Sequence, residues 1–460
     1  MISFSKLAYD NLDDFLYGKA PHPVVLKNGL SIGGGTLYPE INFTLPTMLI
    51  EEHTMPEVIK IYKEIITGIC ERARELYVPG FVAEIETLPP MTFHPEWGEE
   101  VTRTVVEIIR EHAEKYGIKA AVRITPNDIR EGRDLVHMWH GSHWDNILET
   151  FTRCAEAGAE LLAIESVGGK EIHDKAVMTC DIEKSIFALG ILGCRDMAKL
   201  WSEIVQISEK TGTVAAGDTA CGFANTAMVL ADKKYIPRVF AAVVRALSSV
   251  RSLVAVECGA KGPHKDCGYE GVYVKAISGI PIAMEGRCAA CAHLSPVGNV
   301  AISVADLWSN ESVQHIRLLG GMAPTVSFEQ LVFDCRLMNE ASSQGLDKAR
   351  MLRDLNADSD SYLDPQAYVL RPDVVLKIAE GIIMEDTHYH RTKKAAELAI
   401  AAIRKAHDDG EIKALEDKEL NYLDLLEETV ADMPSDESKF IEHMLEECEG
   451  EFDPGKYDMD

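Results

Sequence analysis

The sequence predicts an α/β fold, a (βα)8 barrel with an N-terminal extension and a C-terminal helical segment. Short apolar runs rich in β-forming residues alternate with helical patterns, which is typical of βα units. Six such runs occupy residues 81–86, 119–125, 160–166, 213–219, 252–257 and 280–286. Each run is apolar enough to be buried on both faces, which indicates a parallel sheet, either closed into a barrel or open and doubly wound.

Polar residues at or near the ends of these runs favour the closed barrel. They are Glu86, Thr125, Glu165, Asp218, Glu257 and Glu285. In a (βα)8 barrel the carboxyl ends of all strands converge on one face, where the active site is built. In an open sheet only the ends at the switch point would share a site. A barrel therefore gives all of these side chains a common location.

The stretches between the runs have the period of amphipathic helices. Over 96–117 apolar residues recur at helical spacing, and Gly117 stands where a helix is expected to end. Beyond the barrel the patterns are helical, without strand-like runs. We expect an N-terminal extension with a helix over 1–75, the barrel with its site over 76–340, and an acidic helical segment over 341–460.

Composition excludes several classes of partner. The chain has 460 residues, 46% of them hydrophobic, so it can bury a large core. Its formal net charge of −28 argues against a nucleic-acid or anionic-membrane partner, because both require a basic surface. Residues 408–460 contain 20 acidic and 4 basic residues. This acidity serves solubility or provides a docking surface for a basic partner.

The start of the chain and its cysteines indicate a reducing compartment. The first residues, "MISFSKLAYDNLDD", lack the basic flank and apolar region of a signal peptide. No uncharged apolar run approaches the ~18 residues of a membrane helix. We therefore expect a cytoplasmic protein, in which the 11 cysteines are reduced thiols or metal ligands.

Common catalytic motifs do not account for the glycines and most cysteines. The glycine clusters at 33–35 and 167–170 match no phosphate-binding spacing and are expected to be turns. No G-x-S-x-G elbow of a serine hydrolase occurs. The C-x-x-C-x-H stretch from Cys288 to His293 could supply zinc ligands, but it has no second ligand pair, and core packing is the simpler interpretation.

Three residues on the predicted active-site face suit one metal ion. Glu165 ends one run, Cys221 follows the next, and Cys267 lies in the polar loop "GPHKDCGYEG". Two thiolates and a carboxylate give zinc three protein ligands and leave the fourth position open, as in catalytic zinc sites. Spacing alone leaves Cys258 as an alternative to Cys267.

Long stretches spread over almost the whole chain carry a resemblance to a known family. They include "GGGTLYPEIN", "IESVGGKE", "AAGDTACGFANTAM", "RSLVAVECGAKGPHKDCGYE", "MEGRCAACAH", "DLWSNESV" and "DPQAY". Together they resemble the zinc-dependent methanol:corrinoid methyltransferases. The resemblance implies a TIM barrel with added helical segments, and zinc ligands at Glu165, Cys221 and Cys267. The sequence departs from the family pattern at Ala220, Cys258 and Cys288, and the two extra cysteines have no family role.

The resemblance also implies a reaction and a partner. The expected enzyme contains one Zn²⁺ per chain, cleaves the C–O bond of methanol and passes the methyl group to the Co(I) corrinoid of a partner protein in a hetero-oligomer. The chain itself lacks the D-x-H-x-x-G stretch by which corrinoid proteins ligate cobalt. Alternatives are a zinc enzyme that uses another methyl donor, such as a methylthiol, and a non-catalytic scaffold subunit.

The leaving oxygen of methanol needs a proton, and Asp218 is the candidate to handle it. Asp218 ends a predicted strand three residues before Cys221, which places it near the metal. The alternative is that Asp218 caps the following helix or supports a ligand.

Overall fold

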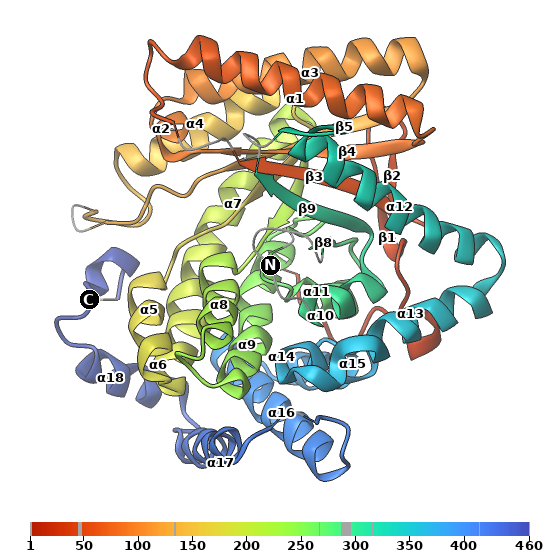
Figure 1. Cartoon of the computed structure of the whole chain (residues 1–460). Coiled ribbons are helices and arrows are strands. Elements are labelled where there is room, and N and C mark those ends of the chain that lie inside the picture. The colour runs from red at the N-terminus through yellow and green to blue at the C-terminus, as the bar shows by residue number, and fades with distance from the viewer. Residues whose placement is uncertain are drawn as a thin grey trace.

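A seven-stranded parallel sheet lies at the centre of the fold (Figure 1). The structure is a computed structural model, and it describes residues 2–44, 48–132, 135–265, 267–286, 296–313, 317–413 and 415–459. The strand order is β7-β6-β5-β4-β3-β9-β8. The strands are β3 (Tyr38–Thr44), β4 (Gly80–Thr87), β5 (Lys119–Pro126), β6 (Leu161–Ile164), β7 (Val214–Asp218), β8 (Ala283–Glu285) and β9 (Leu307–Val313). All neighbouring pairs are parallel.

The segment 261–264 closes this sheet between β7 and β8. The amides of Lys261 and Gly262 donate to carbonyl oxygens of β7 at 2.8 and 3.0 Å. His264 forms a parallel bridge with Ile282, directly before β8. With this segment in the eighth position the strands form a ring, which confirms the predicted barrel-like α/β fold.

The prediction of a strand over 252–257 is wrong. These residues form the end of α9 (Arg238–Glu257), a helix whose residues are buried from Val239 onward. A short apolar run cannot be distinguished from a segment of a fully buried helix by periodicity, and this explains the error. Consequently Glu257 does not lie at a strand end, and its carboxylate pairs with Arg391 at 2.6 Å.

The helix α9 is also long and apolar enough to cross a membrane by length and composition alone. Its apolar window is 100% buried inside the protein, however, as in the core helix of a globular fold.

The N-terminal 75 residues contribute a hairpin that covers one end of the barrel and one strand of the barrel sheet. The antiparallel hairpin of β1 (Lys19–Val25) and β2 (Ser31–Gly34) packs its apolar side chains against the inward-facing residues of the main strands. Strand β3 pairs with β4 on one side and β9 on the other. The hairpin fills the amino-terminal end of the barrel, so the carboxyl end is left for the site.

Helices surround the barrel and make up most of the remainder of the chain (Figure 1). They are α1 (Met55–Glu75), α2 (Pro89–Phe93), α3 (Pro95–Tyr116), α4 (Ser142–Glu156), α5 (Lys170–Thr179), α6 (Ile182–Ile186), α7 (Cys194–Thr211), α8 (Thr226–Asp232), α9, α10 (Gly271–Ser278), α11 (Pro296–Ala301), α12 (Ala323–Ser343), α13 (Leu346–Asp360), α14 (Pro365–Tyr368), α15 (Pro372–Ile383), α16 (His388–Asp408), α17 (Asp417–Asp432) and α18 (Glu437–Glu447). Gly117 ends α3 with a φ of 72°, as the sequence predicts.

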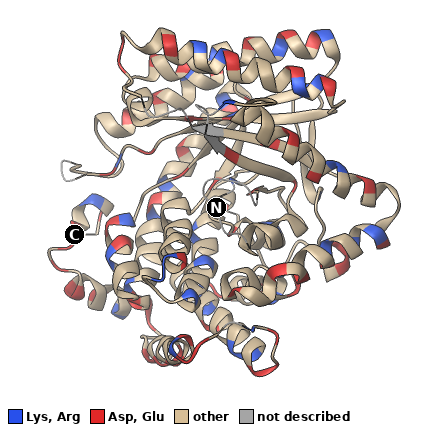
Figure 2. Cartoon of the chain, viewed as in Figure 1, with Lys and Arg blue, Asp and Glu red and all other residues tan. Residues whose placement is uncertain are grey.

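Charged residues follow the outer helices. Figure 2 shows acidic and basic residues spread over these helices, among them the C-terminal ones. Helices α13 to α18 lie within the segment 341–460, which the sequence predicts to be acidic and helical. The division of the chain into three parts at residues 75 and 340 remains a prediction, and β3 belongs to the barrel sheet although it lies in the first part.

A buried ion pair crosses the barrel interior. Arg123 on β5 donates to both carboxylate oxygens of Glu40 on β3, at 2.6 and 3.1 Å, and to the carbonyl oxygen of Pro263 at 2.9 Å. Both side chains are fully buried. The pair therefore connects two non-adjacent strands to the closing segment.

Replacing Arg123 by Met should strongly destabilise the protein. The substitution leaves the buried carboxylate of Glu40 without its guanidinium, and loss of one partner of such a pair costs about 3–5 kcal/mol. Urea unfolding followed by circular dichroism measures the effect. Arg110→Met, at an exposed position of α3, is the control and should change the free energy of unfolding by less than about 0.5 kcal/mol. Equal unfolding midpoints for both variants would contradict this role of the pair.

Candidate metal centre

Glu165, Cys221 and Cys267 come together at the carboxyl end of the barrel. One potential ligand atom from each lies within 4.8 Å of the others. The Sγ of Cys267 is 3.3 Å from Oε1 of Glu165. Cys267 is buried, whereas Glu165 and Cys221 are half-buried. The three residues that the sequence singles out thus form one cluster, and two of them are partly exposed.

Each of the three residues follows a different strand position. Glu165 comes directly after β6, and its backbone forms a parallel bridge with Asn127. Cys221 starts a π-helical turn, Cys221–Asn225, after β7. Cys267 follows the closing segment 261–264. The parallel strands therefore bring these three candidate ligands to the same end of the barrel, as expected for a (βα)8 site.

The donor set suits a metal ion that prefers sulfur and oxygen. Two thiolates and one carboxylate satisfy three of the four positions of a tetrahedral Zn²⁺ site. No cluster of this kind other than Glu165, Cys221 and Cys267 is found among the described residues.

Cys258, the alternative to Cys267, lies elsewhere. Cys258 follows α9, and its Sγ is 3.7 Å from the carbonyl oxygen of Ala198 and 3.9 Å from Oγ of Ser202, both on α7. It is not part of the cluster. The stretch from Cys288 to His293 lies outside the described residues.

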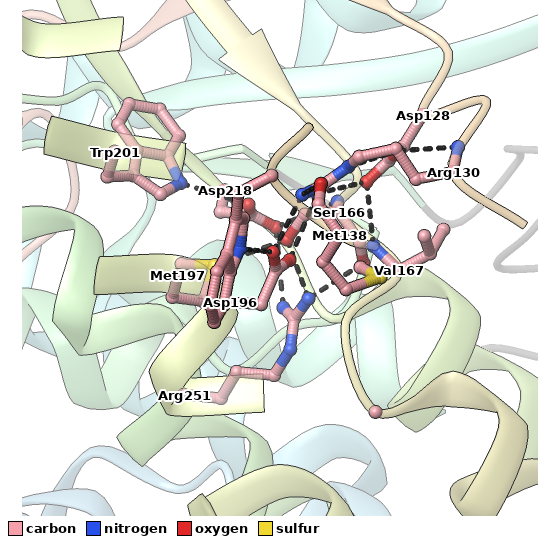
Figure 3. Close-up of polar contacts among 12 residues, drawn as sticks. Asp128, Arg130, Met138, Ser166, Val167, Asp196, Met197, Trp201, Asp218 and Arg251 are labelled. Carbon is pink, nitrogen blue, oxygen red and sulfur yellow. Dashed lines mark hydrogen bonds and ion pairs between the residues drawn. The ribbon is translucent and has the colours of Figure 1, made fainter. Parts of the chain in front are cut away.

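Asp218 and Arg251 hold the backbone next to Glu165 (Figure 3). Arg251 of α9 donates to the carbonyl oxygen of Ser166 at 2.7 Å and to its Oγ at 2.6 Å. Asp218 accepts hydrogen bonds from the amide of Ser166 at 3.3 Å and from Nε1 of Trp201 at 3.0 Å, and lies 3.4 Å from Arg251. Burial raises the pKa of Asp218, while Arg251 opposes this effect.

The contacts of Asp218 bear on the role predicted for it. Its carboxylate is fully buried, and its partners are Ser166, Trp201 and Arg251. These contacts favour the alternative interpretation, in which Asp218 supports the ligand Glu165. Its role as a proton carrier remains a prediction.

Arg245 and Thr219 hold the backbone next to Cys267. Arg245 of α9 donates to the carbonyl oxygen of Gly268 at 2.8 Å, and the amide of Gly268 donates to Oγ1 of Thr219 at 2.8 Å. A Cβ atom at position 268 would clash with the carboxylate of Glu270 and the hydroxyl of Thr219. The glycine after Cys267 is therefore required by packing.

Glu270 holds the backbone next to Cys221. Its Oε1 accepts hydrogen bonds from the amide of Ala220 at 2.7 Å and from the hydroxyl of Ser252 at 2.6 Å. Burial alone would raise the pKa of Glu270, but His264, Ser252 and Ala220 outweigh it and the pKa is lowered. Glu270 is therefore an ionised acceptor inside the core.

The support of the cluster converges on one helix. Arg245, Arg251 and Ser252 all lie on α9, and each contacts a group that fixes a ligand segment. These residues were missed in the sequence because their partners are far away along the chain. A signal was present, since a charged residue in an otherwise apolar buried helix requires a partner.

The end of the chain also supports the Glu165 segment. The amide of Gly169 donates to the hydroxyl of Tyr457 at 2.9 Å, and that hydroxyl donates to Glu171 at 3.0 Å. Asp128 accepts the amide hydrogen of Val167 at 3.0 Å and pairs with the buried Arg130 (Figure 3). The segment after Glu165 is thus held from two sides.

The chain is similar to known proteins over almost its whole length. The model of the family described as methanol-cobalamin methyltransferase B subunit matches residues 1–458. The methanol–corrinoid protein co-methyltransferase of Methanosarcina barkeri (strain Fusaro / DSM 804) is 41% identical over 398 residues, which are 85% of each chain. A chain in the crystal structure of the methanol:cobalamin methyltransferase complex MtaBC from Methanosarcina barkeri has a TM-score of 0.94 and 37% identity, with coverage of 99% of this chain and 100% of that one.

Acid should destabilise the folded protein through His173 of α5. This imidazole is fully buried against Phe223 of the π-helical turn. Burial, with Lys170 and Arg251 nearby, lowers its pKa from 6.5 to about 3. Below pH 6.5 the histidine is protonated in the unfolded chain but stays neutral in the folded protein. The free energy of unfolding therefore falls by up to about 1.4 kcal/mol per pH unit below pH 6.5.

Urea unfolding of the metal-free protein between pH 7 and pH 4 measures this effect. His173→Phe keeps an aromatic ring against Phe223 but cannot titrate, so its stability should depend less steeply on pH. The same pH dependence in both proteins would show that His173 is not responsible.

Proposed function

The chain belongs to the family of methanol-cobalamin methyltransferase B subunits, and from this premise we infer that it is a methanol:corrinoid protein methyltransferase. It cleaves the C–O bond of methanol and transfers the methyl group to the Co(I) corrinoid of a partner protein. The family model covers nearly the whole chain, and the fold matches a subunit from a methanol:cobalamin methyltransferase complex over its full length. The corrinoid comes with the partner, so the working enzyme is a hetero-oligomer.

We propose that Glu165, Cys221 and Cys267 hold one Zn²⁺ ion. The observation that supports this is the cluster of their ligand atoms within 4.8 Å. When bound there, zinc supplies Lewis acidity that polarises the C–O bond of methanol, whose hydroxide is otherwise a poor leaving group.

The three proposed ligands are held in position by other residues of the chain, without bound substrate. Buried hydrogen bonds next to each ligand hold the two thiols and the carboxylate close together. Supporting contacts of this kind keep metal ligands in position. Glu165 and Cys221 are half-buried, which leaves a side from which methanol and the corrinoid can approach. No disulfide is found among the nine described cysteines, and we propose a cytoplasmic location, where thiols stay reduced.

Removing a thiol ligand should remove both zinc and activity. The wild-type protein should contain about one zinc ion per chain, and Cys221→Ala and Cys267→Ala should lose it. Elemental analysis gives the zinc content, and conversion of added cob(I)alamin to methylcobalamin in the presence of methanol gives the activity. Full activity of zinc-free protein would refute the proposed site.

Cys258→Ala is the matched control, because Cys258 packs against α7 outside the cluster. It should keep wild-type zinc content and activity.

The substrate is tested by assaying methanol, a methylthiol and a methylamine side by side with the wild-type protein. A preference for the methylthiol would show that the methyl donor is not methanol.

Asp218→Asn distinguishes the two roles of Asp218. If the carboxylate supports Glu165, the variant should bind zinc about 10-fold or more weakly and retain normal activity per bound zinc. If it transfers the proton instead, zinc content should be normal and the rate should fall about 10²–10⁴-fold. We expect the first result, since the carboxylate is already engaged by Ser166, Trp201 and Arg251.

A further inference from the structure

Lys265 places its ammonium group inside the mouth of the barrel, two residues before Cys267. The side chain is 1% exposed. Its Nζ lies 2.6 Å from Oε1 of Glu84, 3.0 Å from Oε1 of Glu86 and 3.6 Å from Oε1 of Glu165. Among the described residues, this buried cation contacts three carboxylates, and one of them belongs to the proposed metal ligand Glu165.

The two carboxylates from β4 are fixed by their own neighbours. Glu84 is fully buried and accepts a hydrogen bond from Thr125 of β5 at 2.6 Å. Glu86 accepts one from Asn42 of β3 at 2.9 Å. Because both acceptors are held by the sheet, they define the position of the Lys265 ammonium group.

The third carboxylate is held from two sides at a single atom. Oε1 of Glu165 lies 3.3 Å from Sγ of Cys267 and 3.6 Å from Nζ of Lys265. The atom that faces the neighbouring ligand therefore also faces the cation. We therefore expect a change at Lys265 to alter the orientation of Glu165 and the electrostatic field at its carboxylate.

We propose that Lys265 is a positioning residue that sets the Lewis acidity of the metal, and this rests on the zinc site proposed above. Two thiolates and a carboxylate give a site with Zn²⁺ a net charge of about −1, which weakens the metal as an acid compared with neutral ligands. The ammonium group draws negative charge from Glu165 and offsets this effect. It also fixes which way the ligand carboxylate points.

The geometry separates this role from that of a purely structural ion pair. Glu84 and Glu86 alone would satisfy Lys265 as a buried pair. Its additional approach to Glu165, with Cys267 two residues along the chain, is what couples the cation to the metal. Removing the charge should therefore alter the metal site even when the barrel stays folded.

The test compares Lys265→Met and Lys265→Arg with the wild type, each loaded with saturating zinc and, separately, with Co²⁺. In Lys265→Met we expect metal content to stay at the wild-type level and kcat with methanol and cob(I)alamin to fall about 10–100-fold. The visible absorption bands of bound Co²⁺ should shift, because the geometry and charge of Glu165 change. Lys265→Arg keeps the charge and should recover part of kcat.

Lys261→Met is the matched control, since Lys261 is exposed on the same segment. It should leave the Co²⁺ bands and kcat unchanged. If Lys265→Met does not fold, as judged by circular dichroism, the variant that combines it with Glu84→Gln restores the charge balance and is tested in the same way.

The outcomes separate two failures. A wild-type protein without metal would refute the proposed function and the role of Lys265 with it. Metal-loaded variants with wild-type Co²⁺ bands and kcat would refute the role of Lys265 alone. Loss of metal from Lys265→Met at saturating concentrations would also overturn it, since Lys265 would then be needed to assemble the site.

Discussion

The geometry of the candidate metal centre depends on how the barrel closes. The closing segment 261–264 hydrogen-bonds to β7 and bridges to the residue before β8 without forming a regular strand. Side chains supply what the short ladder does not: Arg123 donates to the carbonyl oxygen of Pro263 from inside the barrel, and Arg245 donates to that of Gly268 from outside. Because Cys267 lies between these two anchors, the closure of the barrel also fixes the position of this candidate ligand.

The buried arginines of the apolar helix α9 hold the backbone next to two of the candidate ligands. A buried cation is costly unless it is fully paired, so each arginine constrains the groups that pair with it. Arg251 fixes Ser166 beside Glu165, and Arg245 fixes Gly268 beside Cys267. The helix lies in a densely packed core that resists small displacements. The distance between Glu165 and Cys267 is therefore determined largely by a rigid helix that contributes neither residue.

The sequence predicts the parts of the fold whose signals are local. Strands β4 and β5 coincide closely with the apolar runs at 81–86 and 119–125. Strand β3 was missed because it carries polar residues such as Glu40 and Asn42, which are buried by partners on other strands. Likewise the ligand types at strand ends are visible in the sequence, but spacing cannot separate Cys258 from Cys267. The family resemblance favours Cys267, and the structure shows why: Cys258 directly follows α9 and packs against α7, whereas Cys267 lies beyond the closing segment, next to Glu165.

The acidic C-terminal segment is also part of the site's support. A chain that carries −16 of its −28 charges in residues 408–460 would be expected to keep that segment in solvent. Instead the backbone carbonyl of Tyr457 accepts a hydrogen bond from Arg195, and the Tyr457 hydroxyl contacts Gly169 and Glu171. Gly169 is four residues from Glu165, so the tail stabilises the same segment that Arg251 and Asp218 hold. Its acidic helices thus provide surface charge, while Tyr457 helps to hold the segment that follows the candidate ligand Glu165.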